Sequence, residues 1–404
     1  MKPADSYDVK TRRGERRFNQ IKVCVFLSGL SIFSQLYIFQ PMLPHLCKTF
    51  ALNPAASSWA VSSATAGMAL GLLFFSFKAD SWPRKNLMSF SMLTSSVLTL
   101  VSAFIPWFWP LVAVSFVRGA LLAGVSAVAL TYLNEEVEDR SLGFAISLYL
   151  SGNAVGGMSG RIISAFLSGW LGWRATLAIV GLLTLAVGLC FWKLFPESRN
   201  FSPQKVLLKS KLCQMGQYMR TPVMLKAYSA AFLLMGCFVS VYNFTGFHLE
   251  SPPYSLPHTL IACIFLMYTT GIAGSLTAGR ISTDRRPELT IRYFVAGDVA
   301  GLLLMMCQHL LPLGLGLGVF TFSFFGTHAL ASRIVSQNAG EGRSTATSLY
   351  WLFYYFGSSV LGTGTGTVLS GFGWSCFIML LIAINMLTLT WLWRMGKEKG
   401  HLKL

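Results

Sequence analysis

The sequence has little charge, and acidic charge is the scarcest. Charged residues make up only 12% of the 404 residues, whereas hydrophobic residues make up 53%. A typical soluble domain carries about 25% charged residues, so the surface of this chain cannot be mostly in contact with water. The composition therefore excludes an ordinary soluble fold. It predicts an exterior that faces lipid, where one charge at the bilayer centre costs roughly 2.5–3.5 kcal/mol.

The sequence also lacks the patterns of metal, disulfide and catalytic sites. Its eight cysteines form no Cys-x-x-Cys pair and lie mainly in apolar runs, where a free thiol behaves as a small hydrophobic group. No group of nucleophile, base or metal ligands converges at a membrane surface, and the loops are too short for a soluble catalytic or sensing domain. We therefore expect no metal, no cofactor and no enzyme. A membrane enzyme or sensor remains a remote alternative.

Apolar runs long enough to cross about 30 Å of hydrocarbon occur twelve times. The predicted fold class is therefore an all-α membrane protein with twelve transmembrane helices. The first run lacks the small-residue cleavage site of a signal peptide, and further spans follow it. It is therefore predicted to be a retained transmembrane helix and not a cleaved signal. The predicted spans are 22–41, 57–77, 87–105, 110–133, 142–167, 175–195, 226–248, 259–280, 289–309, 313–333, 344–368 and 374–393.

The two halves of the chain carry a sparse internal repeat. Ser147-Leu-Tyr to Gly172-Trp173 recurs without a gap as Ser348-Leu-Tyr to Gly373-Trp374, an offset of 201 residues with seven identities from 145 to 173. Transporters made of repeated halves bind their substrates near the midplane between those halves. We predict two pseudo-symmetric six-helix bundles. The predicted divisions are a basic cytoplasmic arm at 1–21, bundles at 22–195 and 226–393, a central cytoplasmic loop at 196–225 and a tail at 394–404.

The net charge of +17 is explained by topology. If the N-terminus is cytoplasmic, 28 of the 32 Lys and Arg residues fall on cytoplasmic segments, as the positive-inside rule requires. This placement predicts a multi-pass protein of the bacterial inner membrane with both termini in the cytoplasm, in contact with anionic lipid. No DNA-binding motif accompanies the basic residues, so no nucleic-acid partner is expected.

The loop between the second and third spans reads Lys78-Ala-Asp80-Ser-Trp-Pro-Arg84-Lys85, and the corresponding loop of the second half reads Gly279-Arg-Ile-Ser-Thr-Asp284-Arg285-Arg286. The first resembles the loop signature of the major facilitator superfamily, although Ser76 and Pro83 replace its two glycines. The resemblance implies that the acidic and basic residues of both loops form a cytoplasmic gate. The gate residues would be Asp80, Arg84, Lys85, Asp284, Arg285 and Arg286.

Further motifs resemble the drug/proton antiporter branch of that superfamily, and within it the YnfM-like inner-membrane transporters. They are Tyr37-Ile-Phe-Gln-Pro-Met-Leu-Pro44, Tyr132-Leu-Asn-Glu-Glu136, Pro196-Glu-Ser-Arg199, Ser151-Gly-Asn-Ala-Val-Gly-Gly-Met-Ser-Gly-Arg161, Tyr242-Asn243 and Phe325-Gly-Thr-His328. The resemblance implies a proton-coupled exporter of a small organic compound that works as a monomer. An uncoupled facilitator and a carrier of sugars or sugar acids remain alternatives.

Glycines recur on one face of the fifth span and in the eleventh. Small residues at such spacing let helices approach closely, which suits both ordinary packing and a hinge between rocking bundles. The antiporter pattern has Gly-Pro in the fifth span, where this chain has Asn153 and no proline. The candidate packing and hinge glycines are Gly152, Gly156, Gly157, Gly160, Gly362 and Gly366.

Ionisable residues within spans are functional candidates because charge is costly there. Arg118 is assigned to the cavity by family analogy, with bonds to helix carbonyls as the alternative. Asp298 is the only acid deep within a span, and is either a coupling acid or one member of a structural pair. His328 combines an unperturbed pKa near 6.5 with a presumed cavity helix, but could also be a core histidine. Arg161 could extend outwards to the interface or serve a gate.

Polar and aromatic side chains on the presumed cavity helices complete the predicted site. Aromatic surface with a few hydrogen-bonding groups suits an amphipathic organic molecule, although interfacial belts use Tyr as well. The predicted substrate cavity comprises Gln35, Tyr37, Gln40, Arg118, Tyr242, Asn243, His328, Tyr354 and Tyr355. The candidates for proton coupling are His328, Asp298 and Arg118.

Overall fold

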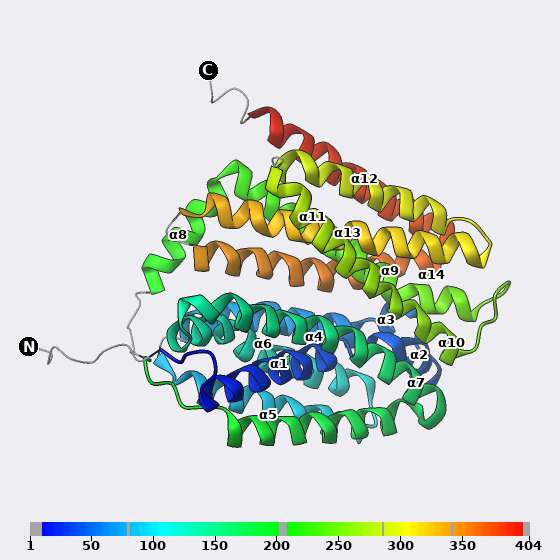
Figure 1. The fold of residues 1–404 in the computed structure, drawn as a ribbon. Helices are drawn as coiled ribbons and strands as arrows, with labels where there is room; N and C mark the ends of the chain where they lie inside the picture. The colour runs from blue at the N-terminus through cyan, green and yellow to red at the C-terminus, as the bar shows by residue number, and fades with distance from the viewer. Residues whose placement is uncertain (1–9, 79–80, 202–207, 285–286, 341–342, 399–404) are drawn as a thin grey trace, which may run out of the picture.

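The computed structural model describes residues 10–78, 81–201, 208–284, 287–340 and 343–398, and this part of the chain is helical with no strand. The helices form two bundles that lie side by side (Figure 1). The first contains α1 (Arg16–Leu36), η1 (Gln40–Met42), α2 (Leu43–Phe50), α3 (Pro54–Ser57), α4 (Trp59–Lys78), α5 (Arg84–Ser102), α6 (Phe108–Glu136) and α7 (Asp139–Leu194). The second contains α9 (Pro222–Glu250), α10 (His258–Ile261), η3 (Ala262–Met267), α11 (Tyr268–Asp284), α12 (Pro287–Met305), α13 (Leu310–Asn338) and α14 (Arg343–Glu398).

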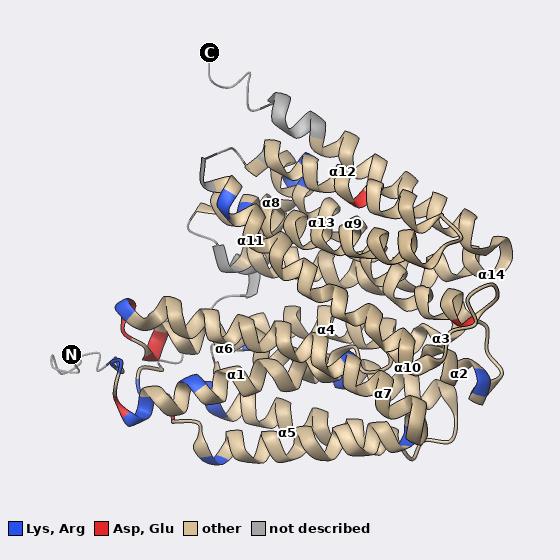
Figure 2. Cartoon of the chain, turned by 45° about the vertical axis from the view of Figure 1, so that its right-hand side comes forward, with Lys and Arg blue, Asp and Glu red and all other residues tan. Residues whose placement is uncertain are grey.

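The helix lengths confirm the twelve predicted spans. Among the described residues, eight helical segments are long and apolar enough to cross a membrane. Two of these, α7 and α14, are 56 residues long and each holds two spans that meet at a kink. The other two predicted spans correspond to α5 and α12, each of 19 residues. Charged residues gather near the helix ends and are rare along the helices (Figure 2).

The kinks lie at equivalent positions of the internal repeat. Gly172 breaks α7 with φ 78°, and Gly373 breaks α14 with φ 80°. Residues other than glycine rarely adopt this left-handed backbone conformation. Both bends therefore require the glycine that the repeat places there. The following tryptophans also have parallel roles. Trp173 donates to Thr49 Oγ1 at 3.1 Å, whereas Trp374 donates to the Met305 carbonyl at 3.0 Å.

The fifth-span glycines pack α7 against α1. A Cβ placed at Gly156 would lie 2.3 Å from the Leu30 carbonyl oxygen, and Gly152 and Gly160 meet α1 backbone in the same way. A Cβ placed at Gly357, the repeat partner of Gly156, would likewise clash with the Phe232 carbonyl oxygen of α9. These glycines therefore set close contacts inside each bundle rather than between the bundles.

Two segments differ from the predicted elements. The first span was predicted as one helix over 22–41, but α1 ends at Leu36 and the chain turns before η1 and α2. Pro41 lies in η1 and Pro44 in α2; neither can donate a backbone hydrogen bond, so a continuous helix is disfavoured there. The central connection 196–225, predicted as a loop, contains the helix α8 (Leu208–Arg220).

The N-terminal arm docks on the first bundle at one end of the molecule. Thr11 pairs with Val137, and Arg17 forms an ion pair of 2.7 Å with the buried Glu136. The Glu136 carboxylate also accepts backbone hydrogen bonds from Arg199 and Asn200 at 2.6 and 2.8 Å. This end, where the arm and α8 lie, is named the arm end, and the opposite end, with α2, α3 and α10, the distal end (Figure 1).

Candidate functional site

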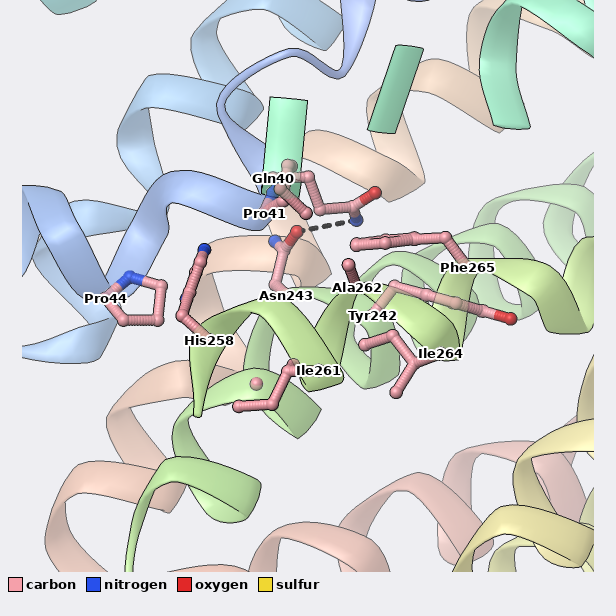
Figure 3. Close-up of a pocket in the computed structure, with 12 residues that line it drawn as sticks. Gln40, Pro41, Pro44, Tyr242, Asn243, His258, Ile261, Ala262, Ile264 and Phe265 are labelled. Carbon is pink, nitrogen blue, oxygen red and sulfur yellow. Dashed lines mark hydrogen bonds between the residues drawn. The ribbon is translucent and has the colours of Figure 1, made fainter. Parts of the chain in front are cut away.

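The bundles are joined by hydrogen bonds at and beyond the point where α1 breaks. Gln40 Nε2 donates to Asn243 Oδ1 at 2.8 Å (Figure 3). Asn243 Nδ2 in turn donates to the Gly362 carbonyl of its own bundle at 3.1 Å. The small cavity beside this pair has a volume of about 10 Å³, which is close to the minimum for one water molecule. Gln40 and Asn243, both predicted cavity residues, therefore close the interface on its distal side.

A second inter-bundle contact lies at the distal end itself. The His258 ring bonds the Glu250 carboxylate at 2.8 Å and lies 3.3 Å from the Ser168 hydroxyl of the first bundle. Lys48 reaches Glu250 at 3.4 Å, and the His45 ring packs edge-on against His258 with centroids 4.3 Å apart. We name these five residues the distal latch.

A third contact joins α4 to α14 within the distal half. Thr363 hydrogen-bonds the hydroxyls of Ser62 and Ser58, at 2.7 and 3.2 Å. Gly362 and Gly366 leave room for this approach, because a Cβ at Gly366 would lie 3.0 Å from Ala55 Cα. The ribbons of the two bundles diverge from here towards the arm end (Figure 1). The glycines of the eleventh span thus lie at the interface between bundles, in contrast to those of the fifth.

Arg161 occupies the centre of the interface. Its side chain is buried, and its Nε donates to Gln40 Oε1 at 2.6 Å. The guanidinium lies over the rings of Tyr37 and Tyr268, 4.2 and 4.8 Å from their centroids. It therefore points inwards between the bundles rather than outwards to the interface with water.

Phenol groups surround this arginine from both bundles. Tyr242 stacks against Phe265 and its hydroxyl lies 2.8 Å from Thr321 Oγ1. The hydroxyls of Tyr37 and Tyr268 are buried and have no hydrogen-bond partner in the described part of the chain. We name Arg161, Tyr37, Tyr242 and Tyr268 the arginine cage. It is aromatic, cationic and supplied with two unused hydroxyls.

Arg118 lies on α6 in the interior of the first bundle. It is completely buried, and within the described residues none of its three guanidinium nitrogens has a hydrogen-bond partner. Its guanidinium carbon lies 5.0 Å from the centroid of Phe39, just after the break in α1. The alternative considered from sequence, in which Arg118 donates hydrogen bonds to helix carbonyls, is therefore not observed among the described residues.

Asp298 lies on α12 inside the second bundle. It is also completely buried, and both carboxyl oxygens lack a partner among the described residues. Its neighbours are Thr327 on α13 and Cys237 on α9, and Cys237 in turn approaches Asn385. No basic residue forms an ion pair with it in that part of the chain, and the Thr327 hydroxyl is a polar neighbour.

His328 lies on α13 in an aromatic cluster. Its Nδ1 lies 2.8 Å from the Tyr350 hydroxyl, and its ring lies 4.8 Å from that of Tyr354 and 5.4 Å from that of Trp351. As a residue, His328 is half-buried, whereas Asp298 is completely buried. His328 thus pairs with Tyr350, which lies one helical turn from the predicted cavity residue Tyr354. Among the described residues, its ring forms no hydrogen bond to a carbonyl group.

The remaining predicted cavity residues separate into two groups. Tyr354 and Tyr355 on α14 come near Tyr37 of the first bundle. Gln35 does not join them, because it accepts a hydrogen bond from Thr99 of α5 at 2.8 Å and is directed into the first bundle. Gln35 and Tyr37 are two residues apart, and this spacing puts side chains on roughly opposite faces of a helix, so one faces the bundle interior and the other the interface.

The arm-end loops contain part of the predicted gate. Arg84 binds the Glu135 carboxylate with two nitrogens, at 2.8 and 3.2 Å, and Lys85 pairs with Glu197 at 3.1 Å. These bonds lie within the first bundle and its connection to α8. Asp80, Arg285, Arg286 and the side chain of Asp284 lie outside the described residues.

Sequence reasoning did not place Arg161 and Tyr268 in the central site, and it missed the distal latch. Arg161 directly follows Gly160, the last of the fifth-span glycines that pack against α1. Its position next to this helix contact was a usable signal that its side chain lies inside the protein. Tyr268 begins α11 after the irregular η3, and no periodic pattern marks it. Glu250 and His258 flank a loop, and only the three-dimensional arrangement brings them together.

Two helical bundles joined across a polar midplane, with buried ionisable groups, define a membrane transport protein. The chain belongs to the Major Facilitator Superfamily, which its sequence matches over residues 25–363. It is therefore a multi-pass membrane transporter of small molecules and not an enzyme. The superfamily membership inferred from the loop motifs is confirmed.

Relatives and solved structures agree with this assignment. The chain is 36% identical to the uncharacterized transporter YybF of Bacillus subtilis, over 94% of each chain. It is 35% identical to the inner membrane transport protein YnfM of Escherichia coli, over 95% of this chain and 93% of that one. A chloramphenicol resistance protein of Streptomyces lividans is 26% identical over 90% and 93%. A bacterial homologue of the lysosomal transporter Spinster shares the fold, with TM-score 0.76, 15% identity and coverage of 94% and 95%.

Proposed function

We propose that this transporter exports a small organic compound across the inner membrane in exchange for protons, by alternating access of a site between the two bundles. The observation that carries the proposal is the carboxyl group of Asp298, which is completely buried without a hydrogen-bond partner among the described residues. An unpaired carboxylate in such surroundings costs several kcal/mol, so the neutral acid suits this conformation. A proton carrier needs a group that is neutral in one conformation and ionised in another.

The arrangement of the bundles supports alternating access. The described inter-bundle hydrogen bonds gather at the midplane and the distal end, through Gln40, Thr363 and the distal latch. Rocking of one bundle against the other would break these bonds and open the distal side. Gly362 and Gly366 allow the close approach that must be released, so they are the hinge candidates that this geometry favours.

We further propose that the arm end faces the cytoplasm, with both termini there, and that the transporter works as a monomer. The positive-inside rule supports this orientation. The domain divisions expected from sequence, with bundles at 22–195 and 226–393, remain part of this proposal, although α1 begins at Arg16, α9 at Pro222 and α14 ends at Glu398. The gate role of Asp80, Arg84, Lys85, Asp284, Arg285 and Arg286 is part of the same proposal. In this conformation Arg84 and Lys85 pair with acidic residues of their own half of the chain. The name of the Streptomyces lividans relative favours export as the direction.

The test is proton flux in everted membrane vesicles energised to acidify their interior. Dyes, biocides, sugars and organic acids are added in turn to vesicles that hold the wild type, Asp298→Asn or His328→Ala. Proton release by one compound class, abolished in Asp298→Asn and retained in His328→Ala, is the expected result. Release that survives Asp298→Asn would refute the assigned role of Asp298, and its loss in His328→Ala alone would assign coupling to the histidine. Compound movement without proton release would indicate a facilitator.

A further inference from the structure

The midplane of the interface carries positive charge without a balancing acid. Arg161 is 4% exposed, and in the described part of the chain it forms no ion pair with a carboxylate. The described acidic residues lie elsewhere: Glu15, Glu135, Glu136, Glu138, Asp139 and Glu197 at the arm end, Glu250 at the distal end and Asp298 inside the second bundle. A buried cation is normally paired, so an unpaired one at the substrate position calls for an anion from outside the chain.

We propose that the arginine cage recognises an organic anion that has an aromatic body, with its carboxylate or sulfonate bound by Arg161. This inference rests on the proposed transport function, because it names the substrate class of the same site. Arg161 uses Nε for Gln40 and Nη1 for the Gly157 carbonyl, and within the described residues no hydrogen bond uses Nη2. A guanidinium nitrogen bonded to an anionic oxygen forms one of the stronger hydrogen bonds in proteins.

The two unused phenols provide the remaining donors. Tyr37 comes from the break in α1 and Tyr268 from the start of α11, so an anion between them contacts both bundles. Each hydroxyl is buried and without a partner among the described residues, and burying such a group costs about 1–3 kcal/mol until it is satisfied. An acceptor that bonds Arg161, Tyr37 and Tyr268 together satisfies all three groups at once.

The walls of the cage select the body of the anion. Phe238 stacks on Phe324 with ring centroids 3.9 Å apart, and it also contacts Tyr242 and Tyr268 at 4.9 and 5.7 Å. These rings are buried against one another in this conformation, so they form a wall for a substrate only after the bundles separate; a flat aromatic ring then packs on them better than a sugar, whose hydroxyls need partners of their own. This surface favours aromatic acids over the sugar alternative.

Anion binding would also be linked to the distal contact. The same guanidinium holds Gln40 at 2.6 Å, and Gln40 holds Asn243 of the other bundle at 2.8 Å. An anion that draws Arg161 away leaves Gln40 free to turn, which weakens a bond between the bundles. Occupancy of the cage thus changes the balance between conformations, as a transport cycle requires.

The test is calorimetric binding to the purified full-length chain in lipid nanodiscs, with three probes of one shape and different charge. Benzenesulfonate is the anion, benzamide the neutral probe and benzyltrimethylammonium the cation. We expect the wild type to bind benzenesulfonate at least tenfold more tightly than either other probe. Arg161→Gln should remove that preference, whereas Arg140→Gln, an exposed arginine on the same helix, should change it less than twofold.

A folding defect in Arg161→Gln does not remove the test. Tyr268→Phe deletes one unused hydroxyl without changing the ring, and should weaken sulfonate binding about threefold to tenfold with benzamide unchanged. Equal or tighter binding of benzamide or the cation by the wild type would overturn the proposal, as would absence of sulfonate binding. Anion binding without proton release in vesicles would refute proton-coupled export alone. Proton release driven only by neutral or cationic compounds would refute the anion site alone.

Discussion

The two bundles share a scaffold and differ in the charges that they bury. Gly172 and Gly373 bend equivalent helices with nearly equal φ, and Gly156 and Gly357 press equivalent helix pairs together. Away from the arm end, however, the first bundle buries Arg118 and Arg161, whereas the second buries Asp298 and holds the half-buried His328. The two halves thus repeat the backbone geometry and differ in the ionisable side chains that they carry. We infer that the first bundle holds the anion and the second the proton.

The largest expected effect comes from breaking the shared scaffold. Gly156→Leu and Gly357→Leu should each destabilise the fold by more than about 3 kcal/mol, because the new side chain meets a backbone carbonyl that cannot move aside. The measurement is the apparent melting temperature and the yield of monodisperse protein. Gly143→Leu, where a Cβ has open space, is the matched control. A near-normal melting temperature in either variant would contradict the equivalence of the two contacts.

The division of charge is tested by removing one buried group from each bundle. Arg118→Met and Asp298→Leu each replace an unpaired buried ionisable group with an apolar side chain. Replacing buried ionisable groups with apolar ones is commonly neutral or stabilises the fold by about 1–4 kcal/mol. We expect equal or higher melting temperatures together with at least a tenfold loss of proton-linked transport. Arg174→Met should instead lower the melting temperature, because Arg174 bonds the carbonyls of Ala103 and Ile105. Full transport by Arg118→Met would remove that residue from the mechanism.

Substrate exchange without a proton gradient separates the two bundles further. Asp298→Asn should keep exchange of labelled substrate within about threefold of the wild type, since the asparagine has the shape of the acid but cannot ionise. Arg161→Lys should reduce the same exchange about tenfold, because an ammonium group lacks the planar fork of the guanidinium. Equal losses of exchange in both variants would show that the bundles do not divide the two tasks.

Sequence patterns predicted the fold better than the site, for physical reasons. Span length and the positions of Gly172 and Gly373 depend on local backbone and on lipid, so twelve spans and the repeat could be read directly. The sequence could not show which side chains near the end of α1 point towards the other bundle. Gln35 and Tyr37 are two residues apart and so lie on roughly opposite helix faces, but only the packing of the bundles decides that Gln35 is directed into the first bundle and Tyr37 lies beneath Arg161. Contacts between bundles, such as Ser168 with His258, depend on the packing of the two bundles and leave no local pattern.

The smallest predicted effect concerns the distal latch, whose two halves come from different bundles. Glu250→Gln should loosen the distal side, because the carboxylate serves both His258 at 2.8 Å and Lys48 at 3.4 Å. Lys48→Met should have little effect, since Lys48 is 77% exposed and exposed ion pairs contribute only about 0–1 kcal/mol. The reporter is Ala165→Cys in a background without other cysteines, because Ala165 lines the closed cavity beside Gln40 and Asn243. Its labelling by an impermeant maleimide from the distal side should rise about threefold to tenfold in Glu250→Gln and less than twofold in Lys48→Met. Equal labelling in all three proteins would mean that the latch does not hold the bundles closed, and that the bonds of Gln40 and Thr363 suffice.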